Sequence, residues 1–153
     1  MIEVFRLSPE RYARKLSGRG SARLGARWNS AGVELVYTAS NRSLAMAEVL
    51  VHLSWTDIPN NLMMAAIGLP DDILIENISD DEMPSTWNIF PHTKETQEIG
   101  DRFVAKRRSC VLRVPSVVTR GDFNLLINPH HPQFPTIKIL RLEKFKFDRR
   151  LFR

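Results

Sequence analysis

A single acidic residue interrupts one of the most apolar stretches of the chain. Glu48 lies within 44–53, Leu-Ala-Met-Ala-Glu-Val-Leu-Val-His-Leu, where its neighbours are apolar apart from His52. An ionised carboxylate in such surroundings bears a large desolvation penalty unless it has polar partners. Arg27 precedes it next to the turn signal Asn29-Ser30-Ala31-Gly32, and we expect the two side chains to approach each other in the fold. In a cleft, such a pair can stabilise developing positive charge and hold an anionic group.

Each of these residues allows two interpretations. Glu48 can be a structural acid, paired with an arginine or with His52 on the same helical face, or a carboxylate held in a cleft for chemistry. Arg27 can be the ion-pair partner of Glu48, or it can bind a phosphate, whose geometry the guanidinium fork matches. Tyr37 can be a core tyrosine, or its ring can be a platform on which a flat ring stacks. Glu48, Arg27 and Tyr37 form the candidate catalytic set.

Two further polar residues are candidates of a less specific kind. Ser116 follows a proline, with neither a Gly-x-Ser-x-Gly elbow nor a nearby histidine, so a hydrolase triad is unsupported. Asn128 precedes Pro129 and can be a turn residue or an amide that binds a polar ligand. His130 and His131 lack the spacing of metal ligands, and the chain has no Walker loop and no Gly-x-Gly-x-x-Gly motif. We therefore predict no metal, and any nucleotide must be held in some other way.

Local signals predict the elements that position the candidate residues. Ser40 or Asn41 is expected to cap the helix that carries Glu48. Apolar residues alternate with others over 33–38, which predicts the strand that carries Tyr37. The turn before this strand holds Arg27 close to it in sequence.

The rest of the chain reads as a mixture of strands and helices. Ser8 and Pro9 form a helix-start pattern, which predicts a helix to about Leu16, followed by a glycine-punctuated loop. The other expected elements are strands at 3–7, 62–69, 73–78, 111–114, 137–142 and 145–147, an apolar segment at 124–128 and a helix at 93–106. Because strands outnumber helices in a mixed order, the predicted class is α+β around a twisted sheet.

Length and composition predict a single domain over residues 1–153. The chain has 153 residues, of which 43% are hydrophobic and 25% charged. It has no apolar run long enough for a membrane, no secretion-signal pattern at its start and one cysteine, Cys110, which favours a cytoplasmic location. The net charge of +5 can mean a solvated basic surface or an anionic partner such as a nucleotide, RNA or an acidic protein. Since the basic residues are scattered, nucleic-acid binding is not the first interpretation.

A set of local motifs runs in one order along nearly the whole chain. They are Leu16–Gly20, Gly25–Gly32, Tyr37–Ala39, Ala47–Leu53, Gly100-Asp101, Val114–Ser116, Leu126–Pro132 and Phe147–Leu151. Together they resemble the RES-domain family, the toxin component of Xre–RES toxin–antitoxin modules. The family is named for an Arg, a Glu and a Ser, which fall here on Arg27, Glu48 and Ser116. One departure is Ala26, where a second glycine is expected, and alanine is a mild change unless the backbone there needs a positive φ.

The resemblance implies a fold, a substrate and a partner. The fold would be like that of the ADP-ribosyltransferases, a twisted antiparallel or mixed sheet with flanking helices. NAD+ would be the substrate, without a metal, cleaved at the nicotinamide–ribose bond by hydrolysis, phosphorolysis or transfer of ADP-ribose to a protein acceptor, which arrests growth. An Xre-like antitoxin protein would block the active site, and DNA would be contacted only indirectly through that antitoxin.

The resemblance also implies roles for individual residues. Glu48 would hydrogen-bond the ribose 2′-hydroxyl and stabilise the cation that forms at the sugar, a charge build-up familiar from glycoside cleavage. Arg27 would anchor the pyrophosphate or the adjoining ribose, and Tyr37 would stack on nicotinamide. The remaining substrate-binding residues would be Ser116, which orients Glu48 or the ribose, together with Asn128, Trp28 and Asn29.

Two hypotheses from other classes stay open. A basic RNA-binding or RNA-cleaving toxin is supported by net charge alone, and it would need an acid–base set or an aromatic-basic stripe that the sequence does not display. A non-catalytic binding module would use Arg27 and Glu48 as a structural ion pair. Identification of the products formed from NAD+ separates these hypotheses.

Overall fold

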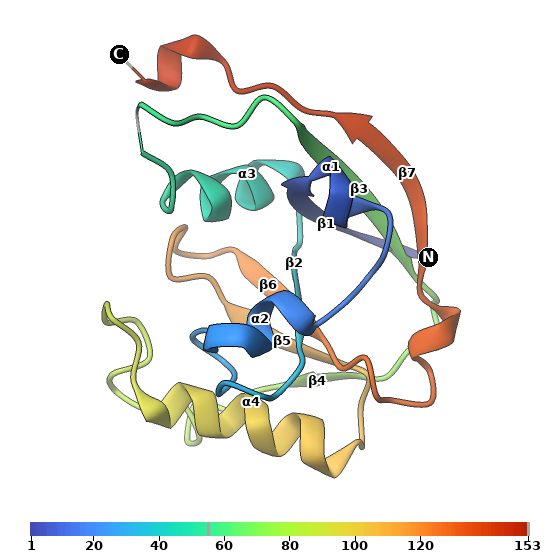
Figure 1. Ribbon diagram of the computed structural model, residues 1–153. Coiled ribbons are helices and arrows are strands. Elements are labelled where there is room, and N and C mark those ends of the chain that lie inside the picture. The colour runs from blue at the N-terminus through green and yellow to red at the C-terminus, as the bar shows by residue number, and fades with distance from the viewer. Residues whose placement is uncertain (55, 153) are drawn as a thin grey trace.

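Seven strands form one twisted sheet in the computed structural model, which describes residues 1–54 and 56–152 (Figure 1). The strands lie in the order β4-β5-β6-β2-β1-β3-β7, and only β4 and β5 pair in parallel. Their bounds are β1 Ile2–Pro9, β2 Val36–Ala39, β3 Leu62–Leu69, β4 Ile75–Asn77, β5 Val111–Pro115, β6 Phe123–Ile127 and β7 Lys138–Lys144. The predicted α+β class is confirmed.

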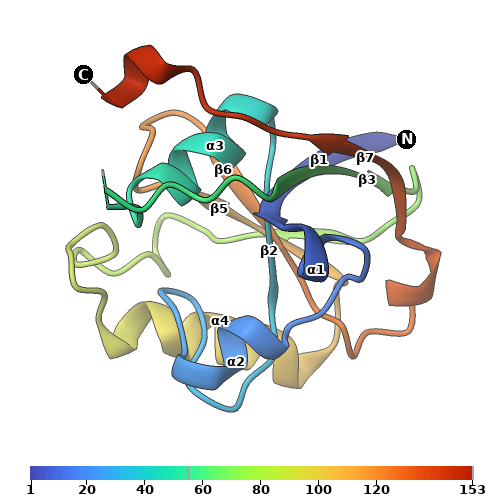
Figure 2. The ribbon, with the colours of Figure 1, turned by 45° about the horizontal axis from the view of Figure 1, so that its top comes forward.

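Within the described residues, four α-helices and two short 3-10 helices accompany the sheet. They are α1 Glu10–Ala13, α2 Arg19–Leu24, α3 Arg42–Leu50, α4 Lys94–Lys106, η1 Phe134–Thr136 and η2 Arg149–Phe152. Figures 1 and 2 both place α3 near β1 and β3, with α2 and α4 together at the opposite end of the molecule. Among residues 1–54 and 56–152, no helix has the length and apolar character that crossing a membrane requires.

The pairing between strands divides the sheet into two parts. β1 pairs with β3 along its whole length, from Ile2 opposite Leu69 to Pro9 opposite Leu62. On its other side β1 pairs with β2 at one position only, Phe5 opposite Ala39. β2 in turn pairs with β6 over all four of its residues. The sheet therefore consists of a β1-β3-β7 part and a β4-β5-β6-β2 part that are joined at a single residue pair.

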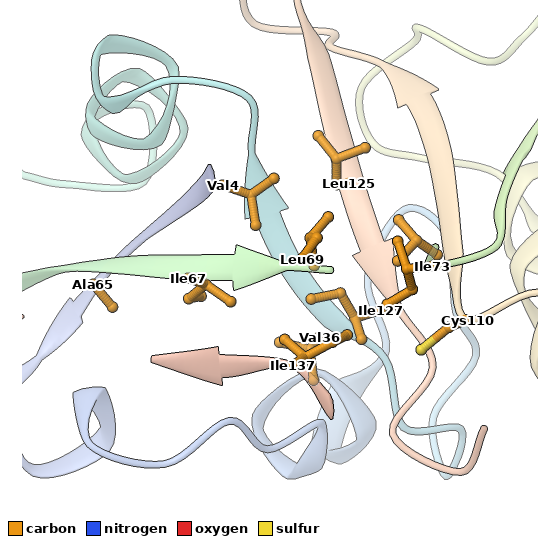
Figure 3. Packing of buried hydrophobic residues seen from close by; sticks show 11 residues of the cluster. Val4, Val36, Ala65, Ile67, Leu69, Ile73, Cys110, Leu125, Ile127 and Ile137 are labelled. Carbon is orange, nitrogen blue, oxygen red and sulfur yellow. The ribbon is translucent and has the colours of Figure 1, made fainter. Parts of the chain in front are cut away.

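Three apolar clusters stabilise this arrangement, because burying apolar side chains is the main favourable term in folding. One face of the sheet carries a cluster that includes both parts of the sheet, with Val4, Val36, Ile67 and Ile127 at its centre (Figure 3). On the other face the core is split. One cluster lies between α3 and the β1-β3 part, and the other lies between α4 and the β5-β6 part. The face between these two clusters is where the candidate site lies.

Most predicted elements are present, and four differ from the prediction. The helix expected from Pro9 to Leu16 is only Glu10–Ala13, because Ser8 and Pro9 continue β1 and pair with β3. The loop expected before Arg27 contains α2, which packs through Ser21: its hydroxyl donates to the Leu35 carbonyl at 2.7 Å.

The other two differences concern strand ends. The strand expected from Val33 begins at Val36, because Val33 closes a turn by donating its N–H to Ser30. The segment Phe145–Phe147 is not a strand; instead its two aromatic rings pack edge to face, with centroids 5.1 Å apart. Side-chain packing here replaces the strand pairing that the apolar pattern predicts.

Candidate active site

A cavity of about 930 Å³ opens where β1 and β2 part. β1 contributes Phe5 to Leu7 to its lining, and β2 contributes Tyr37 to Ala39. The other walls come from the turn before β2, from α3 and the residues after it, from the 90–92 segment, from the end of β5 and the residues after it, and from β6: Gly25, Ala26, Arg27, Trp28, Ala45, Glu48, Val49, Val51, His52, Leu53, Phe90, His92, Pro115, Val117, Val118 and Asn124. Apolar walls with a few convergent polar groups are typical of a small-molecule site.

Glu48 reaches this cavity from the second turn of α3. That helix begins at Asn41, whose side-chain oxygen accepts a 2.8 Å hydrogen bond from the N–H of Leu44, as the capping signal predicts. Leu44 and Ala45 pack into the apolar cluster beneath α3. The packed face of α3 thereby fixes the helix, and Glu48 lies partly exposed beside it in the cavity wall.

Ser116 orients the Glu48 carboxylate. The Ser116 hydroxyl is buried and donates to Oε1 of Glu48 at 3.0 Å. Its oxygen accepts two backbone N–H groups, from Val118 at 3.1 Å and from Thr119 at 3.0 Å. A hydroxyl has one proton to donate, so these two donors leave that proton committed to Glu48. One carboxylate oxygen is held, and the other remains available to a ligand.

Arg27 lies in the turn between α2 and β2 and lines the cavity. Its Nη1 donates to the carbonyl oxygens of Trp87 and Ile89, both at 2.8 Å. Burial lowers the pKa of Arg27, while the charges of Glu48 and Tyr37 act to raise it. No ion pair among the described residues joins Arg27 to Glu48. The arrangement thus disfavours the structural ion pair and leaves Arg27 and Glu48 as neighbouring charges around one cavity.

Tyr37 presents its ring to the cavity while its hydroxyl is bound behind it. The hydroxyl donates to Oδ1 of Asn29 at 2.6 Å and accepts the N–H of Trp28 at 3.1 Å. Burial raises the pKa of Tyr37, so the phenol is neutral. The ring is therefore fixed in place, which suits a surface on which a flat ring stacks.

The other expected substrate-binding residues have different positions. Trp28 lines the cavity and packs on the α4 cluster. Asn29 is fully buried, and its amide donates to carbonyls that include those of Ser21 and Val33, so it braces the turn behind the cavity. Asn128 is also fully buried; it donates to Val104 and accepts from His130 beyond the end of β6, outside the lining. The structure thus brings Glu48, Arg27, Tyr37, Trp28 and Ser116 together, but not the amides of Asn29 and Asn128.

One face of α4 holds the turn that carries Arg27. Gln97 donates to the carbonyls of Ala26 at 3.1 Å and Asn29 at 3.2 Å. Asp101 accepts the N–H of Ser30 at 2.9 Å and its hydroxyl at 2.6 Å. Gly100 lies between them, and a Cβ at this position would fall 1.5 Å from the carbonyl oxygen of Trp28. Sequence reasoning missed Gln97, although its spacing from Gly100 and Asp101 predicts a shared helical face.

The turn itself depends on one glycine. Gly25 has a φ of +77°, and a Cβ there would lie 2.9 Å from the Asn29 carbonyl oxygen. Ala26 pairs with Asn29 through backbone hydrogen bonds, and its φ is not positive. The alanine at the position where the motif has a glycine is therefore accommodated without backbone strain.

Phe90 and His92 also line the cavity and were not expected from the sequence. Phe90 is 83% exposed, so most of its ring is accessible beside the cavity. Nε2 of His92 lies 3.3 Å from Nε2 of Gln97. Burial and the nearby charge of Arg27 lower the pKa of His92, which keeps it neutral near neutral pH. Both residues belong to a segment without apolar periodicity, and so no local signal marks them.

The chemistry available in this cavity follows from its polar groups. It has an oriented carboxylate, a guanidinium, a neutral histidine and a fixed aromatic face. Within residues 1–54 and 56–152, no three His, Cys, Asp or Glu side chains gather as metal ligands would. This set is suited to an anionic ligand with a flat ring, on which a cationic centre develops next to Glu48.

Comparisons with known proteins find relatives that are similar in sequence over most of the chain. A toxin Res of Pseudomonas putida is 37% identical over 142 residues, which is 90% of this chain and 92% of that protein. A Prs ADP-ribosylating toxin of a Sphingobium species is 37% identical over 140 residues, 90% of this chain and 87% of its own. A toxin Res of Yersinia enterocolitica is 32% identical over 97% of this chain and 98% of that protein.

The fold has a counterpart among solved structures. A chain in the crystal structure of the M. tuberculosis MbcT–MbcA toxin–antitoxin complex superposes with a TM-score of 0.72. The match covers 94% of this chain and 84% of that one at 15% sequence identity, which establishes the likeness of fold. The model of the RES domain matches residues 3–148. With nearly the whole sequence matched in this way, the chain belongs to the RES domain family.

Proposed function

We propose that this chain is a toxin enzyme that consumes NAD+ by cleaving its nicotinamide–ribose bond. The observation that carries the proposal is the carboxylate of Glu48, which Ser116 orients inside a cavity shared with Arg27 and Tyr37. The relatives named as Res toxins and as an ADP-ribosylating toxin support it. An ADP-ribosylating protein takes ADP-ribose from NAD+, which requires this bond to break.

Glu48 carries the central step of the proposed mechanism. The C–N bond between ribose and nicotinamide breaks with its electron pair moving to the ring nitrogen, which leaves an oxocarbenium-like cation at the sugar. The free oxygen of Glu48 accepts a hydrogen bond from the ribose 2′-hydroxyl, and its charge stabilises the cation. Water, inorganic phosphate or a protein side chain then bonds to the sugar carbon. Nicotinamide departs neutral, so the step needs no general acid.

Arg27 and Tyr37 hold the substrate in the pose for that step. Tyr37 offers a neutral, fixed ring on which nicotinamide stacks. The hydrogen bonds of the Arg27 side chain within the described residues start from Nη1, so Nη2 and Nε can face the diphosphate or the adjoining ribose. The tie to Trp87 and Ile89 fixes the guanidinium before the substrate arrives, which limits the entropy lost on binding.

We further propose that an Xre-like antitoxin covers this cavity and restrains the enzyme in the cytoplasm. The solved structure with the same fold contains a toxin and an antitoxin, and exposed Phe90 and Val51 lie among the lining residues. A net charge of +5 favours an acidic surface on that partner. DNA would be reached only through the antitoxin, and a protein acceptor of ADP-ribose would approach the same opening.

Product analysis with purified chain tests the proposal and separates the reaction types. The chain is incubated with NAD+ in three conditions: buffer alone, added phosphate, and an extract of bacterial proteins. We expect free nicotinamide in at least one condition. ADP-ribose identifies hydrolysis, ADP-ribose 1-phosphate identifies phosphorolysis, and labelled protein identifies transfer. Intact NAD+ in all three conditions, from a folded chain, would overturn the proposal.

A further inference from the structure

Asn124 is a polar residue of the cavity wall that the proposed mechanism does not use. It is the second residue of β6, opposite Ala39 of β2 on one side and Val114 of β5 on the other. Paired residues of neighbouring strands present their side chains on the same face of a sheet. Ala39 belongs to the apolar cluster beside α3, whereas Val114 belongs to the cluster beside α4. Asn124 therefore lies between these two clusters, on the face where the cavity opens.

The amide of Asn124 is bound to the protein at one of its two ends. Its Nδ2 donates to the carbonyl oxygen of Thr38 at 3.3 Å. A carbonyl can only accept, so this contact identifies the nitrogen end of the amide. Within the described residues Oδ1 has no hydrogen bond, and the hydroxyl of Ser8 is the one buried side-chain oxygen or nitrogen without a partner. Oδ1 is therefore not buried, and it is open to the cavity as a hydrogen-bond acceptor.

This acceptor lies close to the hydrogen bond between Ser116 and Glu48. Asn124 is opposite Val114, and Ser116 follows Val114 by two residues, roughly 7 Å along an extended chain. The Ser116 hydroxyl holds one oxygen of Glu48, and the other oxygen remains available. The cavity thus has two oxygen acceptors near each other, one charged and one neutral. Two such acceptors suit a ligand with two adjacent donors, as in the vicinal hydroxyls of a ribose.

We propose that Asn124 binds the 3′-hydroxyl of the ribose whose 2′-hydroxyl is bound by Glu48. The identity of that ribose rests on the proposed function. The hydroxyl donates to Oδ1 of Asn124 while Nδ2 keeps its bond to Thr38. An amide that is already held at one end loses little freedom when the ligand binds. Asn124 is thus a substrate-binding residue that fixes the rotation of the sugar, so that the C–N bond to be broken lies beside Glu48.

Calorimetry with ADP-ribose and with ADP isolates the contribution of the ribose that carried nicotinamide. Neither ligand contains the bond to be cleaved, so Glu48 stays intact in the test. Asn124→Leu keeps the size of the side chain but removes the acceptor. We expect it to weaken ADP-ribose binding by about 3- to 10-fold, the range for a hydrogen bond between neutral groups, and to leave ADP binding unchanged. Asn77→Leu, the same substitution at an exposed position of β4, should match the parent.

Asn124→Asp is the conservative counterpart, because an aspartate oxygen accepts a hydrogen bond as the amide oxygen does. Its charge acts on the diphosphate of both ligands alike, so the quantity compared is the ratio of the ADP-ribose and ADP affinities. We expect this ratio to be kept in Asn124→Asp and to fall in Asn124→Leu. A parental ratio in a folded Asn124→Leu variant would overturn the proposal. An equal fall in both variants would overturn it as well, since it would assign Asn124 to the fold through its bond to Thr38.

A modified ligand tests the unmutated chain and decides the matter if Asn124→Leu does not fold. The 3′-deoxy analogue of ADP-ribose lacks the hydroxyl assigned to Asn124. We expect the analogue to bind about 3- to 10-fold more weakly than ADP-ribose, with no further loss in Asn124→Leu. Equal affinities of the two ligands for the unmutated chain would overturn the proposal.

The amide group of nicotinamide is the other donor that could meet Asn124, and a comparison with NAD+ separates it from the ribose. On a Glu48→Gln background, Asn124→Leu should weaken NAD+ and ADP-ribose binding by similar factors. Weaker NAD+ binding with ADP-ribose binding intact would assign Asn124 to nicotinamide and overturn the ribose assignment.

Failure of this role is distinguishable from failure of the proposed function. A chain that cleaves NAD+ yet keeps the parental ratio of affinities after Asn124→Leu contradicts the role of Asn124 alone. A chain that binds ADP-ribose through Asn124 but leaves NAD+ intact contradicts the enzymatic proposal alone. An unmutated chain that does not bind ADP-ribose contradicts the role of Asn124 whether or not it cleaves NAD+.

Discussion

The hydroxyl of Ser116 donates a 3.0 Å hydrogen bond to Oε1 of Glu48, across 68 residues of sequence. Two backbone N–H groups bind the same hydroxyl oxygen, so its proton has a fixed direction. The carboxylate is therefore oriented before any ligand arrives. Orientation of this kind lowers the reorganisation needed when charge develops in a transition state.

Glu48→Gln should preserve the fold and remove most NAD+ turnover. Glutamine keeps the shape and can still accept the Ser116 hydrogen bond, but it cannot offset a cationic sugar. A positioned charge or proton-transfer group of this kind is worth about 10²–10⁴-fold in rate. Nicotinamide release and thermal unfolding are measured together, with Glu98→Gln on the exposed face of α4 as the matched control. Parental turnover by the folded Glu48→Gln variant would show that Glu48 is structural.

Ser116→Ala should lower kcat more than it raises KM, because it frees the Glu48 carboxylate without touching the substrate. It also leaves the N–H groups of Val118 and Thr119 without their acceptor. An unsatisfied buried polar group destabilises by about 1–3 kcal/mol, so the melting temperature should fall as well. Ser43→Ala on exposed α3 serves as the control. A loss of stability with kcat unchanged would assign Ser116 to the fold alone.

Arg27→Lys should lose nearly as much ADP-ribose affinity as Arg27→Ala. One nitrogen of Arg27 holds the carbonyls of Trp87 and Ile89, and the residue lines the cavity. A lysine ammonium keeps the charge, but it lacks the planar fork that can donate to these carbonyls and to a ligand at the same time. ADP-ribose affinity is measured by calorimetry on the Glu48→Gln background. Full affinity in the lysine variant would mean that Arg27 acts only as a point charge.

Gly100→Ala should destabilise the chain and reduce turnover together. The added Cβ would meet the carbonyl oxygen of Trp28 at 1.5 Å, so α4 must move away from the turn that carries Arg27. Gly20→Ala is the matched control, since a Cβ in α2 at Gly20 meets nothing within 4 Å. Alanine there favours a helix by up to about 1 kcal/mol. Unfolding and nicotinamide release are measured for both variants, and equal behaviour of the two would contradict the close packing.

Protonation of His92 should lower the free energy of unfolding in weak acid. Burial and the Arg27 charge hold the pKa of His92 below its ordinary value of 6.5, so the folded state binds its proton less readily than the unfolded state. Between those two pKa values the unfolded state carries more protons, and stability therefore rises with pH and declines as pH falls below about 6.5. Denaturant unfolding across this range should show a shallower decline in His92→Gln than in the parent. The same dependence of stability on pH in His92→Gln and in the parent would contradict a lowered pKa of His92.

Local patterns in the sequence predict the elements that bear the site. The strand Leu62–Leu69 was predicted with its observed bounds, because an eight-residue apolar run between polar turns suits a strand buried on both faces. The Asn41 cap and the α3 helix were also predicted, since capping and apolar spacing act within one or two turns. Ser8 shows the limit of such signals: strand pairing with Met63 outweighs its capping tendency.

The order of the strands, which no local sequence pattern contains, decided where the cavity lies and which residues line it. Pairing of β2 with β6, and its near-separation from β1, creates the cavity and brings together residues from seven separate segments. Arg6 has the pattern of an ordinary strand residue, and Phe90 and His92 lie in a segment without periodicity. Their places in the wall depend on contacts between distant parts of the chain. The sequence by itself determined the residue types and the local elements. Long-range pairing and burial determined which side chains share a cavity and which, like that of Asn128, have their hydrogen-bonding groups occupied by nearby backbone atoms.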